Sequence, residues 1–254
     1  MKSKLFTFLL IFGVITLGMV GCKKDKEEPE PEPQPVTTTK PSIASKTQIV
    51  TVPTKLQSST DSNAATAVGY LNTMNSLTTY TSIFTPPANA THSTNKNSTD
   101  TWNWTYDDGQ GHTFAFVYTY SVTSTQHIWD IKLGINGATP VDYAHAEETL
   151  DGTVGNMSFY YSALSNYAGT DLSNYYWYYT WNVDANGYGN ITMEAHNGTT
   201  DVLKYTATVN SDGSGEVNYY INSVLKYRLT WTAAGTGTWY VYDENGTETT
   251  GTWS

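Results

Sequence analysis

The chain has 254 residues, a formal net charge of −10 at pH 7 and a mean hydropathy of −0.41. From residue 100 onward, seventeen acidic residues stand against four basic ones, so the domain repels phosphate backbones, which excludes a nucleic-acid-binding function. The chain has a single cysteine, Cys22, so no disulfide can form within the chain. All eight tryptophans and eighteen of the twenty tyrosines follow residue 100, so we expect an aromatic core there.

The first 22 residues have the order of an export signal. Lys2 and Lys4 give a positive start, an apolar run follows from Leu5 to Val20, and Met19-Val20-Gly21-Cys22 offers a small-residue cleavage site. The run is shorter than the ~20 apolar residues that a membrane-spanning helix needs, which makes a retained helix the weaker alternative. This order resembles the lipobox of bacterial lipoproteins. The resemblance implies a signal peptide over 1–21, a diacylglycerol thioether on Cys22 and a fatty acyl chain such as palmitate on the new N-terminus.

A charged cluster, Lys23-Lys24-Asp25-Lys26-Glu27-Glu28, follows Cys22 directly. It resembles the export signal of surface lipoproteins of Bacteroidetes, which implies an outer-membrane location with the protein displayed on the cell surface. The alternative is a solvated spacer beside an anchor that faces the periplasm. From Glu28 to Pro35, Glu or Gln alternates with Pro, which favours an extended polyproline II chain. We therefore expect residues 22–60 to be a disordered tether.

Residues 61–254 are expected to form a single β-rich domain that begins with an amphipathic helix over 61–84. Asp61 is a suitable N-cap, and the Pro86-Pro87 pair ends the helical pattern. The apolar positions of this segment fall three and four residues apart, on one helix face: Ala64, Ala67, Val68, Leu71, Met74 and Leu77.

After residue 100 the apolar period changes from helical spacing to strict alternation. Trp102, Trp104 and Tyr106 share one strand face, for example, and a glycine-bearing turn at 107–111 leads into the partner strand. Asn-Gly and Asp-Gly turns recur along the rest of the chain. The pattern predicts about eleven strands in an antiparallel up-and-down meander, because the connections are too short for parallel crossovers. We expect this sheet to be strongly curved or closed into a barrel around the helix.

In element order alone, this arrangement resembles the open barrels of lipoprotein carriers and the lipocalin-like barrels. No sequence motif of either family is present, so the resemblance implies only a fold and says little about function.

One strand carries more aromatic side chains than a single buried face needs. Tyr175, Trp177, Tyr179 and Trp181 alternate with Tyr176 and Tyr178, so the two sets point to opposite faces. The surplus set could stack against sugar rings, or it could be structural and covered by a neighbouring loop. We take all six residues as candidate ligand contacts.

His145 and Glu147 form the best acid–base pair in the sequence, since residues two apart on a strand lie on the same side. General acid–base catalysis also needs a pocket and a third group that orients the pair, and the sequence supplies neither. An oxygen-rich series at Asp184, Asn186, Tyr188 and Asn190 lacks the terminal glutamate of calcium loops. We therefore predict no catalytic residue, no metal and no cofactor.

Two functions from different classes fit these observations. The first is a non-catalytic binding module on the cell surface, for a glycan or a protein partner. The second is a carrier that holds a lipid or another apolar ligand inside the curved sheet or barrel. A glycan-processing enzyme ranks last, because the acidic residues fall mostly at turns.

Overall fold

The computed structural model describes residues 41–43, 49–94 and 99–254 of the chain. The expected signal peptide at 1–21, the expected lipidation site Cys22 and the charged cluster after it lie outside the described residues. Within the described part, every helix is too short or too polar to cross a membrane.

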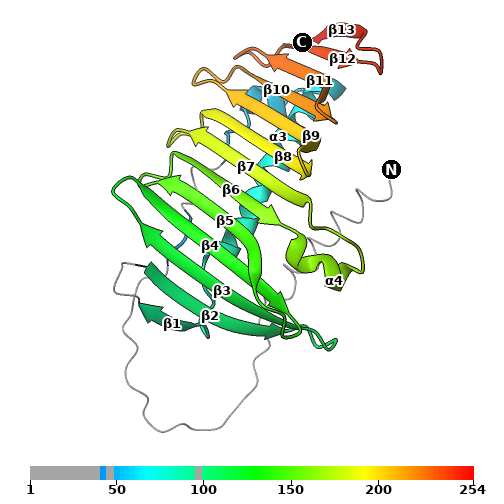
Figure 1. Cartoon of the computed structure of the whole chain (residues 1–254). Coiled ribbons are helices and arrows are strands. Elements are labelled where there is room, and N and C mark those ends of the chain that lie inside the picture. The colour runs from blue at the N-terminus through cyan, green and yellow to red at the C-terminus, as the bar shows by residue number, and fades with distance from the viewer. Residues whose placement is uncertain (1–40, 44–48, 95–98) are drawn as a thin grey trace.

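Thirteen strands form one antiparallel sheet, and their order across the sheet is their order along the chain (Figure 1). The strands are β1 (Thr91–Thr94), β2 (Thr99–Asp107), β3 (Thr113–Val122), β4 (Gln126–Ile135), β5 (Val141–Thr149), β6 (Val154–Tyr160), β7 (Tyr175–Val183), β8 (Gly189–Asn197), β9 (Thr200–Val209), β10 (Gly215–Ile221), β11 (Val224–Trp231), β12 (Gly237–Tyr242) and β13 (Glu248–Trp253). The helical elements are α2 (Thr54–Gln57), α3 (Ser62–Ser76), the 3₁₀ segments η1 (Leu77–Phe84) and η2 (Ser162–Leu164), and α4 (Ser165–Ala168).

The sheet does not close into a barrel, and it has thirteen strands where the sequence predicted about eleven. Both points correct the sequence prediction. β1 and β13 lie at opposite ends of the sheet in Figure 1, and among the described residues each pairs with only one neighbour. The sheet can stay open because helix α3 forms a second layer that buries one face, so closure is not needed to shield the apolar side chains.

One of the additional strands, β1, lies before residue 100, where the sequence shows no alternation, and some hairpin turns carry no glycine. The connection between β3 and β4 is built by Thr123, whose hydroxyl accepts hydrogen bonds from the backbone N–H groups of Thr125 and Gln126. The turn between β10 and β11 uses Asn222 and Ser223 at φ values of 50° and 62°. Residues other than glycine adopt such angles at a small cost, and Asn does so more readily than others. Asn-Gly and Asp-Gly pairs therefore mark only part of the hairpins.

Helix α3 packs across one face of the sheet, which we call the inner face, and contacts β8 to β11. Figure 1 views the sheet from the opposite, outer face, with α3 behind the strands. Asp61 caps the helix as predicted: its carboxylate accepts the backbone N–H of Asn63 at 2.7 Å. Ala64, Ala67, Leu71 and Met74 are buried, and Val68 packs against the core at its margin. Five of the six predicted apolar positions thus lie in or against the core, whereas Leu77 follows the α-helix and its side chain lies outside the described part.

The helical segment reaches Phe84 as expected, but the α-helix itself ends at Ser76 and a 3₁₀ segment continues to Phe84. In this segment the Thr79 hydroxyl donates to the carbonyl of Ser76, and the Ser82 hydroxyl donates to the carbonyl of Thr79. Hydroxyl side chains that bond back to the preceding turn compete with regular helix geometry. Phe84 ends the segment against Phe159 of β6, with ring centroids 5.9 Å apart.

The inner face is aromatic, as the composition predicted. Tyr70 of α3 lies against Tyr205 and Tyr219, with ring centroids 5.3 Å and 5.5 Å apart. This burial, with the neighbouring tyrosines, raises the pKa of the Tyr70 phenol to about 12. Tyr118 is fully buried, and its hydroxyl donates to the carbonyl of Phe84 at 2.8 Å. These contacts fix the helical segment against the inner face of the sheet.

Three inner-face tryptophans each lie over a glycine of the preceding strand. The pairs are Trp181 over Gly155, Trp231 over Gly215 and Trp253 over Gly237. Each indole N–H also donates to a glycine carbonyl in the turn just before that strand: Gly152, Gly213 and Gly235 respectively. A side chain at the covered glycine would displace the indole, so the motif requires glycine there.

Part of the segment expected to be a tether packs against the domain. Ile43, Val50 and Leu56 are buried in the core, and the backbone N–H of Thr51 donates to the carbonyl of Gly187 at 2.8 Å. The apolar core therefore extends to residues before position 60.

Candidate functional site

The six aromatic residues of strand β7 that the sequence offered as ligand contacts lie on two opposite faces of the sheet. Tyr175, Trp177, Tyr179 and Trp181 point to the inner face and pack in or against the core, where Tyr179 and Trp181 are only 1% and 2% exposed. Tyr176 and Tyr178 alternate with them and point to the outer face, where both are half-buried. The structure therefore leaves two of the six at a surface that α3 does not cover.

Tyr178 stands in a row of polar side chains that crosses the outer face from β4 to β9. The strand pairing places these residues side by side: Asp130, His145, Ser158, Tyr178, Glu194 and Lys204. A second, shorter row beside it contains Tyr160, Tyr176 and His196. We call these two rows, together with Glu147 and Asp201, the outer band.

His145 lies between two carboxylates at one end of the outer band. Its Nδ1 is 2.8 Å from Asp130 Oδ1, and its Nε2 is 3.3 Å from Glu147 Oε1. The expected proximity of His145 and Glu147 is thus present, and Asp130 on the neighbouring strand is a partner that the sequence did not reveal. The hydrogen bond to Asp130 raises the pKa of His145 above its usual value, against the opposing effect of burial, and the charges of Asp130 and Glu147 add to the rise.

His196 has a matching environment further along the outer band. Its Nε2 is 3.0 Å from Glu194 Oε2, and its Nδ1 is 3.0 Å from Asp201 Oδ1. The ring of Tyr176 stacks on the imidazole, with centroids 4.4 Å apart and planes 5° apart. Lys204 completes the group, since its Nζ lies 2.6 Å from Glu194 Oε1. Tyr176 is therefore held flat over an ion-pair network.

A β-bulge brings Asp201 into this network. The pairing of β8 and β9 shifts between Ala195 and His196, so that Val202 is skipped and Asp201 stands opposite His196. Bulges of this kind redirect side chains by adding one residue to a strand.

The neighbours of Glu194 and Tyr178 shift the pKa values of both groups. Burial works to raise the pKa of Glu194, but hydrogen bonds from Lys204 and His196 outweigh it and lower the pKa. Tyr178 lies near Glu194 and Glu147, and burial together with these two negative charges raises the pKa of its phenol. Glu194 is thus anionic and the Tyr178 hydroxyl is protonated at neutral pH.

Glu194, His196 and Asp201 are also the group that could hold a metal ion, because one ligand atom from each lies within 4.8 Å of the others. His196 is 8% exposed, and its Nδ1 is close to Asp201 without being aligned for a hydrogen bond. However, the imidazole itself lies between the two carboxylates, and the Lys204 ammonium already neutralises Glu194. The arrangement is that of an ion-pair network, and we assign no metal to it.

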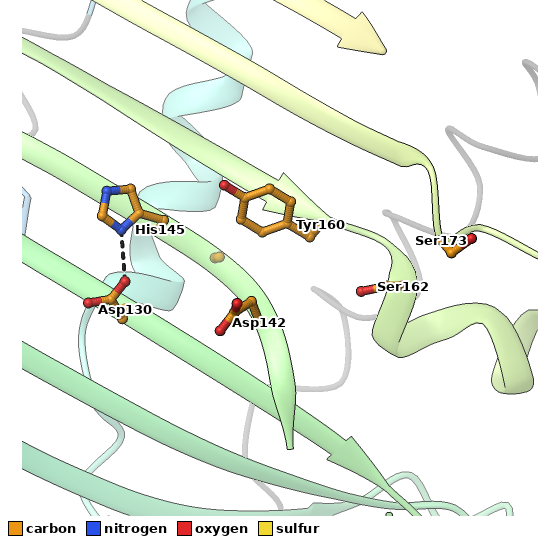
Figure 2. Close-up of a pocket in the computed structure, with 7 residues that line it drawn as sticks. Asp130, Asp142, His145, Tyr160, Ser162 and Ser173 are labelled. Carbon is orange, nitrogen blue, oxygen red and sulfur yellow. Dashed lines mark hydrogen bonds and ion pairs between the residues drawn. The ribbon is translucent and has the colours of Figure 1, made fainter. Parts of the chain in front are cut away.

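A pocket of about 440 Å³ adjoins the His145 end of the outer band (Figure 2). Figure 2 shows its labelled lining residues on the side of the strands that faces away from the helix. Asp130, Asp142 and His145 come from β4 and β5, and Tyr160 comes from the end of β6. Ser162 at the start of η2 and Ser173 just before β7 line the other side. The pocket thus combines carboxylates, hydroxyls and one aromatic ring.

A second hollow of about 400 Å³ lies over β2 and β3, near Asn103 and Val117. Its lining holds no charged side chain, and the residues predicted from sequence as site candidates are not among it.

The remaining sequence candidate was the oxygen-rich series after β7. Asp184 accepts the backbone N–H groups of Asn186 and Tyr188, at 2.8 Å and 3.0 Å. Asn190 accepts the hydroxyl of Thr208 at 2.6 Å. These contacts account for the series as turn and cross-strand chemistry.

Sequence reasoning missed Asp130, Glu194, His196, Asp201 and Lys204. The i, i+2 spacing of Glu194 and His196 was the same signal that drew attention to His145 and Glu147. The cross-strand partners had no such signal, because they depend on register and on a bulge.

A comparison with protein-family models finds no match to this sequence, and a comparison with curated protein sequences finds none either.

Proposed function

We propose that this protein is a lipid-anchored surface lipoprotein of the outer membrane that acts as a non-catalytic binding module, with the outer band as the surface that contacts a glycan. The anchor rests on the lipobox-like sequence that ends at Cys22. The binding role rests on one observation: Tyr176 and Tyr178 stand on the outer face while the inner-face aromatics of the same strand fill the core.

Protein surfaces that bind sugars combine flat aromatic rings with hydrogen-bonding groups, because a pyranose has apolar C–H faces and a rim of hydroxyls. Tyr176 offers a ring that is already fixed by its stack on His196. Glu194 lies beside Tyr178 and supplies an acceptor, and Lys204 lies beside Glu194 and supplies donors. Because the ion pairs fix these side chains before a ligand arrives, little conformational entropy would be lost on binding.

The packing of the inner face favours this proposal over a carrier of apolar ligands. The inner face, where such a carrier would need space, is packed by α3 and by fully buried side chains such as Tyr118 and Met157. Both hollows described above are lined largely by outer-face residues.

The test measures binding of the full chain, solubilised in detergent, to a panel of polysaccharides by calorimetry. Tyr176→Ala and Tyr178→Ala should each weaken the affinity for the bound polysaccharide by about tenfold, the equivalent of one stacking contact of roughly 1.4 kcal/mol. Tyr240→Ala is the matched control, since Tyr240 is a half-buried outer-face tyrosine at the far end of the sheet, where Arg228 lies over its ring.

Unchanged affinity in both variants, or an equal loss in the Tyr240 control, would rule out the tyrosine surface. The anchor is tested in the same cells, where Cys22→Ser should abolish incorporation of labelled palmitate. Protease treatment of intact cells should digest the domain if it is displayed at the surface.

A further inference from the structure

The pocket at the His145 end continues the tyrosine surface of the outer band. Tyr160 lines the pocket, and its ring centroid is 6.1 Å from that of Tyr176. A chain of sugars lying over Tyr176 would therefore meet the pocket at its next residue. A volume of about 440 Å³ is within the range of small-molecule sites and is ample for one pyranose ring.

The cations around this pocket are already paired. Lys132 Nζ lies 3.1 Å from Asp142 Oδ1, and His145 lies between Asp130 and Glu147. Among the lining residues described, an anionic ligand thus meets two carboxylates and no unpaired cation. An acidic sugar would be repelled, and a ligand carboxylate would lose its hydration without gaining an ion pair.

For a cationic ligand the pocket offers only a small surplus of negative charge. With His145 protonated, the charges of Lys132 and His145 nearly balance those of Asp130, Asp142 and Glu147, leaving a surplus of one negative charge. The remaining polar lining consists of the hydroxyls of Tyr160, Ser162 and Ser173, which both donate and accept. Such a lining matches the hydroxyls of an uncharged polyol.

We infer that the pocket binds one uncharged pyranose of the glycan and discriminates against uronic acids. Asp130 and Asp142 accept the sugar hydroxyls, the serine hydroxyls complete the rim, and Tyr160 packs on a ring face. This inference rests on the proposed function, because it names the class of sugar that the same surface selects.

The sharpest test is Asp142→Asn, because it removes a carboxylate acceptor and frees Lys132 at the same time. Asp142 is 75% exposed, so the variant should fold normally. We expect the affinity for a neutral polysaccharide that binds the wild type to fall about fivefold to tenfold. Binding to a uronic-acid polymer, weak in the wild type, should rise by a similar factor.

Glu216→Gln is the matched control on the same sheet face. Glu216 on β10 pairs with Arg228 at 2.7 Å, outside the pocket, so this variant also frees a cation of the outer face. It should leave both affinities unchanged. Ser162→Ala and Ser173→Ala should weaken neutral-polymer binding without improving uronic-acid binding, which separates loss of contacts from loss of charge.

Three results would overturn the inference and leave the proposed function standing. The first is wild-type protein that binds uronic-acid polymers as tightly as neutral ones. The second is preference for an amine-bearing polymer such as a deacetylated amino-sugar chain, which would make the pocket a cation site. The third is an Asp142→Asn variant that behaves like Glu216→Gln while Tyr176→Ala still weakens binding; the proposed function would then stand and only the pocket assignment would fail. If no polysaccharide binds, the proposed function fails and this inference fails with it.

Discussion

Both faces of strand β7 carry aromatic side chains, but different neighbours hold them in place on each face. On the inner face, Trp181 is 2% exposed, lies over Gly155 and donates its indole N–H to the Gly152 carbonyl. On the outer face, Tyr176 stacks on an imidazole that lies between two carboxylates. Inner aromatics are thus fixed by packing and backbone hydrogen bonds, whereas outer aromatics are fixed by charged neighbours. The difference teaches that aromatic content alone does not separate core from surface; the neighbours do.

The largest effect should come from truncating an inner-face aromatic. Trp181→Ala removes a buried ring and leaves the Gly152 carbonyl without its donor, so we expect a loss of about 3–5 kcal/mol in the free energy of unfolding. Tyr178→Ala, on the outer face of the same strand, should cost about 1 kcal/mol or less. Urea unfolding followed by circular dichroism measures both, with equal m-values as the check on comparable transitions.

Equal losses for Trp181→Ala and Tyr178→Ala would break the comparison between the faces. In that case the outer face would also be a packed core, and its role as a binding surface would lose its basis.

An intermediate effect is expected where an inner-face tryptophan needs a glycine. In Gly237→Ala the new Cβ would meet the Trp253 indole and the carbonyl oxygen of Thr230, so we expect a loss of about 1–3 kcal/mol. The matched control is Gly69→Ala in α3, where the new Cβ has no neighbour within 4 Å. That control should stabilise the protein by roughly 0.5–1 kcal/mol, because alanine is the better helix former.

Thermal unfolding distinguishes the two glycine variants by the sign of the change in Tm. A stabilising Gly237→Ala substitution would show that the indole of Trp253 moves aside freely and that the tryptophan–glycine packing contributes little.

The smallest effect concerns the outer-face ion pairs. The folded-state pKa of His145 is raised, so its contribution to stability is full below the unfolded value of about 6.5 and is lost as the pH rises through the folded pKa. We expect at most about 1 kcal/mol, because Asp130 is 51% exposed and the pair is screened by solvent. Urea unfolding at pH 5 to 9 should show this slope, and His145→Gln should remove it.

Asp130→Asn provides the control for that measurement, since the hydrogen bond to Asp130 is the largest cause of the shift. An NMR titration should then give a lower pKa for His145 than in the wild type. An unchanged pKa would mean that Glu147, and not Asp130, is what raises the pKa of His145.

Local periodicity in the sequence determined a large part of this protein. Alternation placed Tyr176 and Tyr178 on one face and Tyr179 and Trp181 on the other, and the three-and-four spacing identified the face of α3 that carries Leu71 and Met74. Short connections made the sheet an antiparallel meander. These features follow from the chain because a side chain's direction repeats every two residues in a strand and every 3.6 in a helix.

Only the tertiary structure decided which side chains meet across strands and that the sheet stays open. Asp130 reaches His145 through the register of β4 and β5, and Asp201 reaches His196 through a bulge that skips Val202. Register and bulges depend on the geometry of each turn and on packing against α3, so no spacing within one strand encodes them. The sheet stays open because α3 and the segment around Val50 and Leu56 cover its apolar face, a pairing of distant parts of the chain that local pattern does not record.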